Sequence, residues 1–358
     1  MSTGLNVQAV SEDAGAGDPR WAAGHPPRER HEETMKAVLT RWGKFVTDAS
    51  AQAAEDYQFL AGDVAIATHS KSGTTMMQQI VHQLRSNGDM EFGEVTEVVP
   101  FMEVALDCEL DLSSSQAPHA PPRAFKTHMS WPAVPKNRTD DGNLASKYLY
   151  VARDFHSVVV SFYRFLLDWF YTAEEVRLCD FVEVFLYRRS TPYWDHVADY
   201  YKAALEEANQ GSFYWLFFED ILKDQEGAVR AVAEFIGIRD KCASDEEFEE
   251  RVKTATEMSS FSFMKENSGH FDERLTKKYR NEVIGAVDGG NGGQKVRAGG
   301  REKASVVLDD TLFEEVATVV GDHLQELLGV RTYAELMDKA KRELGNNVFR
   351  PRTAATAE

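Results

Sequence analysis

The seven residues His69-Ser-Lys-Ser-Gly-Thr-Thr75 constrain this chain more than any other stretch. They follow an apolar run, residues 64–67, and precede a helical pattern. A strand, a short glycine-containing loop and a helix start form a cradle for phosphate, because the first N–H groups of a helix point outward and carry partial positive charge. Lys71 adds a full charge. The hydroxyl donors of the loop are Ser72, Thr74 and Thr75. The apolar face of the predicted helix consists of Met76, Met77, Ile80, Val81 and Leu84.

The position of the lysine restricts what the loop can bind. In a Walker A loop the lysine follows the second glycine of G-x-x-x-x-G-K-[ST]. Here Lys71 precedes Gly73 by two residues, and no earlier glycine lies within the loop. The loop is therefore a poor match to an ATP-binding P-loop. Read alone, it could also be a helix start capped by serine and threonine, with no ligand.

Length and periodicity predict one α/β domain. A chain of 358 residues with 43% hydrophobic residues can bury a large core. Strand candidates alternate with helical patterns, which favours a parallel sheet covered by helices on both faces. We expect a mobile N-terminal tail at 1–30, one catalytic domain at 31–345 and a C-terminal tail at 346–358. The strand candidates are 63–68, 123–127, 147–152 and 213–218, and helical patterns begin at 74, 156 and 193.

Charge and cysteine content exclude several classes of protein. The chain has 58 acidic and 40 basic side chains, a net charge of −18, which argues against binding to nucleic acid or anionic membranes. The longest apolar stretch, 157–173, contains Arg164 and Asp168 and is too short and polar to span a bilayer. Three widely spaced cysteines favour a reducing compartment, so we expect a cytoplasmic protein.

Several segments together resemble one enzyme family. Lys71-Ser-Gly-Thr-Thr75 resembles the 5′-phosphosulfate loop of the cytosolic-type sulfotransferases, which use 3′-phosphoadenosine 5′-phosphosulfate (PAPS). Arg153, at the end of a strand candidate, and Ser161, eight residues later, resemble the family's 3′-phosphate element. Phe125-Lys-Thr-His128 resembles the segment with the catalytic histidine. The resemblance runs from about residue 62 to 305 in the order that the family requires, with further similar segments at 99–103, 215–220, 259–267 and 296–300.

The resemblance implies a P-loop-like sulfotransferase fold and in-line transfer of a sulfuryl group from PAPS to a small phenol, alcohol or amine, without a metal. His128 would be the general base, Lys71 would stabilise the transition state and Lys126 would support the same oxygens. The implied cofactor-binding residues are Lys71, Ser72, Gly73, Thr74, Thr75, Met76, Arg153, Ser161, Phe218, Ser259, Phe261, Arg297, Ala298 and Gly299. The implied acceptor pocket is lined by Phe101, Trp131 and Phe165.

An acidic protein needs a local positive cluster to hold a polyanion such as PAPS. We expect that cluster from Lys71, Lys126, Arg153 and Arg297. Arg297 lies within residues 281–300, which hold seven glycines and few apolar groups. We therefore predict that its loop is mobile without ligand and becomes ordered when Arg297 pairs with the 3′-phosphate.

Departures from the family pattern leave some points open. Met76 stands where the family usually has a tryptophan, Phe218 where many members have a tyrosine, and Ala298 where a lysine is usual. The dimerisation motif of the animal enzymes is not recognisable, so the oligomeric state stays open. Taken singly, the serines could bond to their own helices and the aromatic residues could belong to the core.

Two other functions are compatible with the phosphate loop. An ATP-dependent P-loop-like kinase is disfavoured by the position of Lys71 and by the lack of an obvious magnesium-binding motif. A catalytically inert nucleotide-binding scaffold is disfavoured because the chain retains both Lys71 and His128.

Overall fold

The centre of the protein is a four-stranded sheet in the order β2-β1-β3-β4, in which all neighbouring strands are parallel. The computed structural model describes residues 28–116, 119, 121–189, 191–287, 292–296 and 307–352. Nearly every strand residue is buried, which explains the almost continuous apolar runs in the sequence. The strands, at the positions predicted to within one residue, are β1 (Val64–Thr68), β2 (Ala124–Thr127), β3 (Lys147–Ala152) and β4 (Phe213–Phe217).

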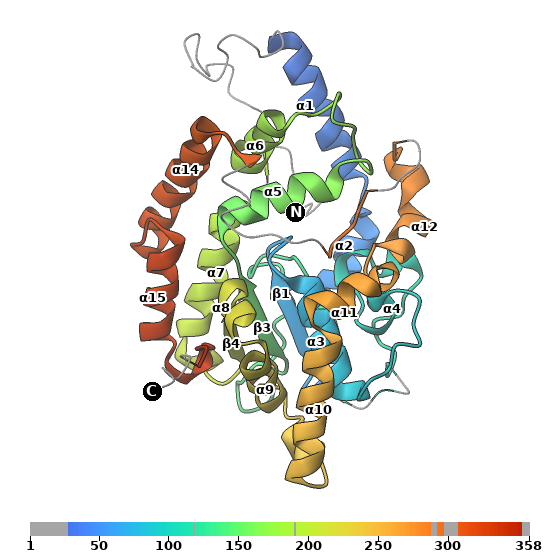
Figure 1. Ribbon diagram of the computed structural model, residues 1–358, viewed down its shortest axis with the longest axis vertical. Helices are drawn as coiled ribbons and strands as arrows, with labels where there is room; N and C mark the ends of the chain where they lie inside the picture. The colour runs from blue at the N-terminus through green and yellow to red at the C-terminus, as the bar shows by residue number, and fades with distance from the viewer. Residues whose placement is uncertain are drawn as a thin grey trace.

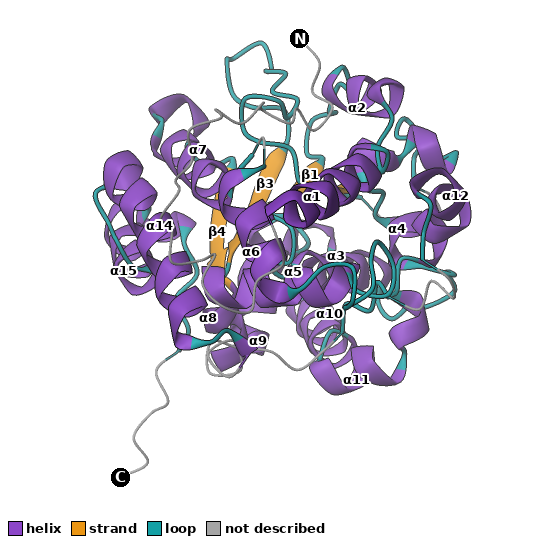
Figure 2. Cartoon of the chain, turned by 90° about the horizontal axis from the view of Figure 1, so that it is seen from above, coloured by secondary structure: helices purple, strands orange, loops and turns teal. Residues whose placement is uncertain are grey.

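Helices flank this sheet, as Figures 1 and 2 show, and the predicted single α/β domain with a central parallel sheet is confirmed. None of the described helices combines the length and the apolar character needed to cross a membrane. In chain order, the helices begin with α1 (Arg28–Gly43), α2 (Asp48–Glu55), α3 (Thr74–Ser86), α4 (Val95–Val98), α5 (Phe155–Leu166), α6 (Leu178–Tyr187) and α7 (Tyr193–Leu205). They are followed by α8 (Phe218–Lys223), α9 (Gln225–Phe235), α10 (Asp245–Met258), α11 (Phe261–Glu266), α12 (Arg274–Ile284), α14 (Asp310–Leu328) and α15 (Tyr333–Glu343).

Alternate residues of each strand enter two separate hydrophobic cores. In β3, Tyr148 and Tyr150 face an aromatic core that includes residues of α5, α6, α7 and α14. Leu149 and Val151 face an aliphatic core built with α3, α9 and α10. Because successive side chains of a strand point to opposite faces, both faces must be covered, and the helices on either side do so (Figure 2).

The carboxyl ends of the strands bring three predicted elements to one edge of the sheet. The register pairs Thr68 of β1 with Val151 of β3, and Ala67 with Thr127 of β2. The phosphate loop follows β1, His128 follows β2, and Arg153 follows β3. In a parallel sheet the loops at this edge form the ligand-binding crevice.

The C-terminal segment is packed further than the sequence predicts. Val348 forms a parallel bridge with Trp215 of β4, and the N–H of Phe349 donates to the Trp215 carbonyl at 2.9 Å. Both side chains are buried, and Arg352 forms an ion pair with Asp224 at 2.6 Å. The expected tail from residue 346 is therefore wrong as far as residue 352. Two apolar residues in a polar segment are too few to produce a periodic signal.

Candidate active site

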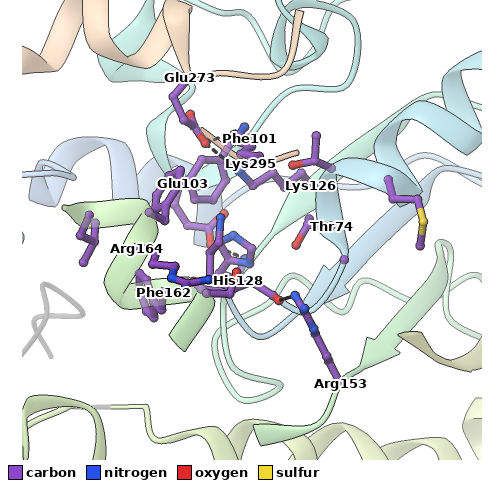
Figure 3. A pocket seen from close by; sticks show the side chains of 18 of the residues that line it. Thr74, Phe101, Glu103, Lys126, His128, Arg153, Phe162, Arg164, Glu273 and Lys295 are labelled. Atoms are coloured by element: carbon purple, nitrogen blue, oxygen red, sulfur yellow. Dashed lines mark hydrogen bonds and ion pairs between the residues drawn. The ribbon is translucent and has the colours of Figure 1, made fainter. Parts of the chain in front are cut away.

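A cavity of about 720 Å³ opens at the carboxyl edge of the sheet. The phosphate loop, the end of β2, and α5 line it together with the segment 294–296, which lies far away in sequence. Figure 3 shows these side chains gathered around His128. The sequence-predicted residues that line this cavity are Lys71, Gly73, Thr74, Thr75, Met76, Phe101, Lys126, His128, Arg153, Ser161, Phe165, Phe218, Ser259 and Phe261.

The phosphate loop has a backbone that few residues can adopt. Gly73 has φ 107° and precedes α3, whose first N–H groups receive no side-chain cap. A Cβ on Gly73 would lie 2.7 Å from the Phe218 ring, so the position needs glycine for both conformation and space. Lys71 also has positive φ, 70°, and non-glycine residues held in this region occur preferentially at functional sites. The loop thus presents uncapped N–H groups to the cavity.

The Lys71 ammonium is half-buried and packs against an aromatic ring. Its Nζ lies 3.7 Å from the centre of the Phe165 ring. Among the described residues, no carboxylate lies within ion-pair distance of this ammonium. Burial, and then the positive charge of Lys295, lower the pKa of Lys71 well below its usual value. A bound anion would relieve both effects.

Arg153 occupies the other side of the loop. Its Nη1 donates to the Lys71 carbonyl at 2.9 Å, and its guanidinium stacks over Phe218 at 4.4 Å from the ring centre. The side chain is 8% exposed, and its Nε is buried without a partner among the described residues. Ser161 lines the same cavity from α5, just over two helical turns further on. These groups could hold a phosphate.

His128 presents one ring nitrogen to the cavity. Its Nδ1 lies 2.8 Å from the Thr68 carbonyl oxygen, which can only accept a hydrogen bond. Nδ1 therefore carries the proton and Nε2 keeps its lone pair. Burial, and then the positive charge of Lys126, lower the pKa of His128 well below its usual value. The neutral imidazole is a base, and Phe101 packs against it with ring centres 5.1 Å apart.

A buried cluster of opposite charges lies next to the base, and sequence reasoning found only one of its members, Lys126. Lys126 lies 3.7 Å from Glu273, which also pairs with Lys295 at 2.7 Å. Lys295 lies 3.6 Å from Glu94. Burial would raise the pKa of Glu273, but Lys295 and then Lys126 outweigh it and lower that pKa. No local motif marks these residues, which are spread over 94–295.

Part of the loop predicted to be mobile without ligand, residues 292–296, is described by the structure and makes backbone and ionic contacts. The N–H of Gly293 donates to the Phe165 carbonyl at 2.9 Å, and the N–H of Gly292 to the Asp168 carbonyl at 3.1 Å. Backbone bonds and a buried ion pair anchor this segment where apolar side chains do not. Arg297, Ala298 and Gly299 lie outside the described residues.

Two other predicted residues do not line the cavity. Ser72 is fully buried and does not line the cavity. Trp131 does not line it either, because its ring packs against Tyr148, Tyr200 and Phe213 in the aromatic core. The acceptor-pocket prediction for Trp131 is therefore wrong.

Both predicted adenine contacts, Ser259 and Phe261, line the cavity. Ser259 lines the cavity, but its hydroxyl already donates to the Ala255 carbonyl at 2.6 Å. Phe261 is 46% exposed and therefore not a core residue. Its ring remains available for contact with a flat ligand at the cavity mouth.

One further cluster lies outside the cavity. Among the described residues, His82, Asp89 and His119 place their ligand atoms within 4.8 Å of one another. Burial, and then the charge of Arg85, lower the pKa of His82 to about 3. The sequence shows no metal-ligand spacing here, and none of the three lines the cavity. The chemistry of the cavity does not use this cluster.

The fold and the site define a P-loop-like α/β domain with a glycine-containing loop and an uncapped helix start at the edge of its sheet. The sequence profile of the family described as "Sulfotransferase domain" matches residues 61–327. The chain therefore belongs to the sulfotransferase family.

The chain is also similar to individual relatives in sequence and to solved structures in fold. Sulfotransferase 1C2 of Homo sapiens is 26% identical over 260 residues, which cover 64% of this chain and 86% of the relative. Sulfotransferase 1B1 of Mus musculus is 28% identical over 265 residues, covering 72% and 79%. In fold, the chain is similar to retinol dehydratase, whose structure was solved in complex with androsterone and the inactive cofactor PAP. The TM-score is 0.59 at 22% identity, and the match covers 85% of this chain and 96% of that chain. Mouse sulfotransferase SULT7A1 complexed with PAP gives a TM-score of 0.53 at 16% identity, covering 83% and 94%.

Proposed function

We propose that this sulfotransferase moves the sulfuryl group of PAPS to a hydroxyl or amine of a small acceptor, with His128 as the general base. One observation carries the proposal: a neutral imidazole, that of His128, and the Lys71 ammonium, which has no ion pair with a described carboxylate, line the same cavity. The cavity thus contains both groups that in-line transfer needs, a base and a charge-stabilising cation. PAP in the two solved structures accords with a nucleotide in this cavity.

The donor would be held at both of its anionic ends. The uncapped N–H groups of α3 and the Lys71 ammonium suit the 5′-phosphosulfate. Arg153 and Ser161 suit the 3′-phosphate, because the Arg153 guanidinium has an unused N–H in a buried position. Phe261 and Met76 line the part of the cavity that would take the adenine.

When bound, PAPS supplies a sulfuryl group whose S–O bond to the 5′-phosphate breaks as the acceptor oxygen bonds to sulfur, giving a sulfate ester and adenosine 3′,5′-bisphosphate. His128 Nε2 takes the proton from the acceptor hydroxyl. Lys71 stabilises the negative charge that grows on the bridging oxygen and on the transferring group. Lys126, 3.9 Å from the centre of the Phe101 ring, holds a second positive charge at the same wall.

The direct test is incubation with radiolabelled PAPS and a panel of phenols, alcohols and amines. We expect label in at least one acceptor, whose mass increases by one sulfuryl group. If no member of the panel accepts a sulfuryl group and one of them accepts a phosphoryl group from ATP, the protein is a kinase and the proposal is wrong.

The three cysteines are free, which supports a reducing compartment, the cytoplasm, as the place of action.

Donor recognition is tested separately by calorimetry. Adenosine 3′,5′-bisphosphate should bind at least tenfold more tightly than AMP, because Arg153 adds a charge-assisted hydrogen bond to the 3′-phosphate. Arg153→Met should remove most of that difference, whereas Arg331→Met, at an exposed arginine, should leave it unchanged. Equal affinity of the wild type for the two nucleotides would show that the protein has no site for the 3′-phosphate.

A further inference from the structure

Two arginines besides Arg153 line the cavity, Arg164 and Arg189, and neither takes part in the proposed transfer. Arg189 lies between α6 and α7, and its guanidinium sits among the rings of Trp42, Phe162 and Phe185. The distances from its central carbon to the ring centres are 5.3, 5.1 and 5.9 Å. Cation–π contacts of this kind stabilise a buried guanidinium but do not neutralise its charge.

The hydrogen-bond partner of Arg189 is uncharged. Its Nη1 lies 2.9 Å from His69 Nε2, and His69 Nδ1 lies 3.0 Å from the Ser70 carbonyl oxygen. The carbonyl can only accept, so Nδ1 of His69 carries the proton and Nε2 accepts from the guanidinium. Burial, and then the charge of Arg189, lower the pKa of His69 well below its usual value, which keeps this imidazole neutral.

Arg189 therefore retains a full positive charge and unused donors. Among the residues that the structure describes, no carboxylate lies within ion-pair distance of it, and its Nε is buried without a partner. The neighbouring Arg188 shows the contrast, since it pairs with Glu183 at 3.1 Å and does not line the cavity. Buried charges in proteins are normally paired, and a planar guanidinium is suited to a two-pronged contact with a carboxylate.

The position of Arg189 points to the acceptor rather than to the nucleotide. Thr68 accepts a hydrogen bond from His128, and the next residue, His69, accepts one from Arg189. The guanidinium thus lies near the base, on the wall that Trp42 forms. Arg153 lies over a different ring, that of Phe218.

We infer that Arg189 binds a carboxylate on the acceptor, so that the substrates of this enzyme carry both a hydroxyl and a carboxylate. The inference rests on the proposed function, because it places the acceptor hydroxyl at His128. It predicts a specificity that an apolar cavity without Arg189 would not have.

The test uses matched acceptors that differ in charge alone. The probes are 4-hydroxyphenyl-substituted alkanoic acids with one, two or three methylene groups, each paired with its primary amide. In the wild type, kcat/KM for at least one acid should exceed that for its amide by tenfold or more, because a hydrogen-bonded charge pair is gained. Arg189→Met should bring that ratio to about one. Arg189→Lys should keep part of it, since a point charge replaces the two-pronged donor. The control Arg188→Met should show the wild-type ratio.

A binding measurement separates this inference from the proposed function. The probe is 3-phenylpropanoate, which has no hydroxyl to sulfate, titrated into protein loaded with adenosine 3′,5′-bisphosphate. Binding that is at least tenfold weaker in Arg189→Met supports the inference whether or not any transfer is seen. Intact bisphosphate affinity in each variant shows that the cavity is folded.

The remaining outcomes are distinct. Transfer from PAPS to acids and amides at equal rates in the wild type would overturn the carboxylate site and leave the sulfotransferase function standing. Arg189-dependent binding of 3-phenylpropanoate without transfer to any acceptor would overturn the proposed acceptor chemistry and leave the carboxylate site. A tenfold preference for acids that persists in Arg189→Met would show that another group reads the charge, and the inference would fail.

Discussion

The Nδ1 atom of His128 lies 2.8 Å from the main-chain carbonyl oxygen of Thr68. Thr68 ends β1 and His128 follows β2, and these two strands are neighbours in the sheet. The register of two parallel strands therefore sets the tautomer of the proposed base. Because a backbone group makes this contact, the orientation of the imidazole does not depend on a second ionisable side chain.

Replacing His128 by alanine should abolish the base without affecting the nucleotide. We expect turnover to fall by on the order of 10²-fold or more, which is typical for loss of a general base. Adenosine 3′,5′-bisphosphate should bind with nearly unchanged affinity in calorimetry, since the hydrogen bonds of the His128 side chain among the described residues go to Thr68 at the end of β1 and not to the phosphate loop. His323→Ala, at an exposed histidine, is the control. Wild-type turnover in His128→Ala would assign His128 a structural role.

Lys71→Met tests charge separately from shape, because methionine keeps much of the stem volume and removes the ammonium. A role in the transition state predicts a fall in turnover of roughly 10²–10³-fold, by analogy with the loss of one oxyanion donor. The matched control is Lys202→Met, at an exposed lysine of α7. A rise in KM for PAPS with unchanged turnover would instead show that Lys71 only binds the ground state.

The sequence predicted those parts of the protein that have a local cause. The four strands and the residues just after them could be located because buried parallel strands read as apolar runs and end at the same edge. Lys71, His128 and Arg153 follow three of these strands. The resemblance to the sulfotransferases was what assigned them, with Gly73, to one site. Trp131 was misplaced because an aromatic residue near a strand end serves a core and a pocket equally well.

The charge cluster could not be predicted, for the opposite reason. Glu94, Glu273 and Lys295 come from loops and a short segment far apart in the chain, and only the fold brings them to Lys126. A single acidic or basic residue in a polar segment is most simply read as a solvated charge. Arg189 was missed in the same way, since its environment comes from three separate elements.

Glu103 should make stability depend on pH. Burial raises the pKa of Glu103 from 4.5 to about 7, while its Oε1 accepts the backbone N–H of His128 at 2.6 Å. Between these two values the folded state keeps a proton that the unfolded state has lost, so this contribution to stability is complete at low pH and is lost as the pH rises toward 7. The variant Glu103→Gln still offers a side-chain oxygen as hydrogen-bond acceptor, but its side chain cannot ionise.

The difference in the free energy of unfolding, Glu103→Gln minus wild type, should therefore increase from pH 5 to pH 7, by up to about 1.4 kcal/mol per pH unit. Urea denaturation at three pH values measures it, with Glu326→Gln, at an exposed position, as the control. A difference that is constant with pH would show that Glu103 ionises equally in both states.

The Lys295–Glu273 pair should anchor the segment 292–296 beside the active site. Two ammonium and two carboxylate groups form the buried cluster, so Lys295→Met leaves an excess negative charge and Glu273→Gln an excess positive one. Each change should lower the free energy of unfolding by about 3 kcal/mol, because an uncompensated buried charge remains.

The double variant Lys295→Met, Glu273→Gln restores the balance of charge, with Lys126 and Glu94 remaining. It should therefore be destabilised by clearly less than the sum of the two single changes, with a coupling of about 1–3 kcal/mol in a double-mutant cycle. Hydrogen exchange gives a second, local measurement: the amide of Gly293, which donates to the Phe165 carbonyl, should lose protection in Lys295→Met. Additive destabilisation with unchanged protection at Gly293 would mean that the backbone bonds alone hold the segment and that the ion pair is incidental to its position.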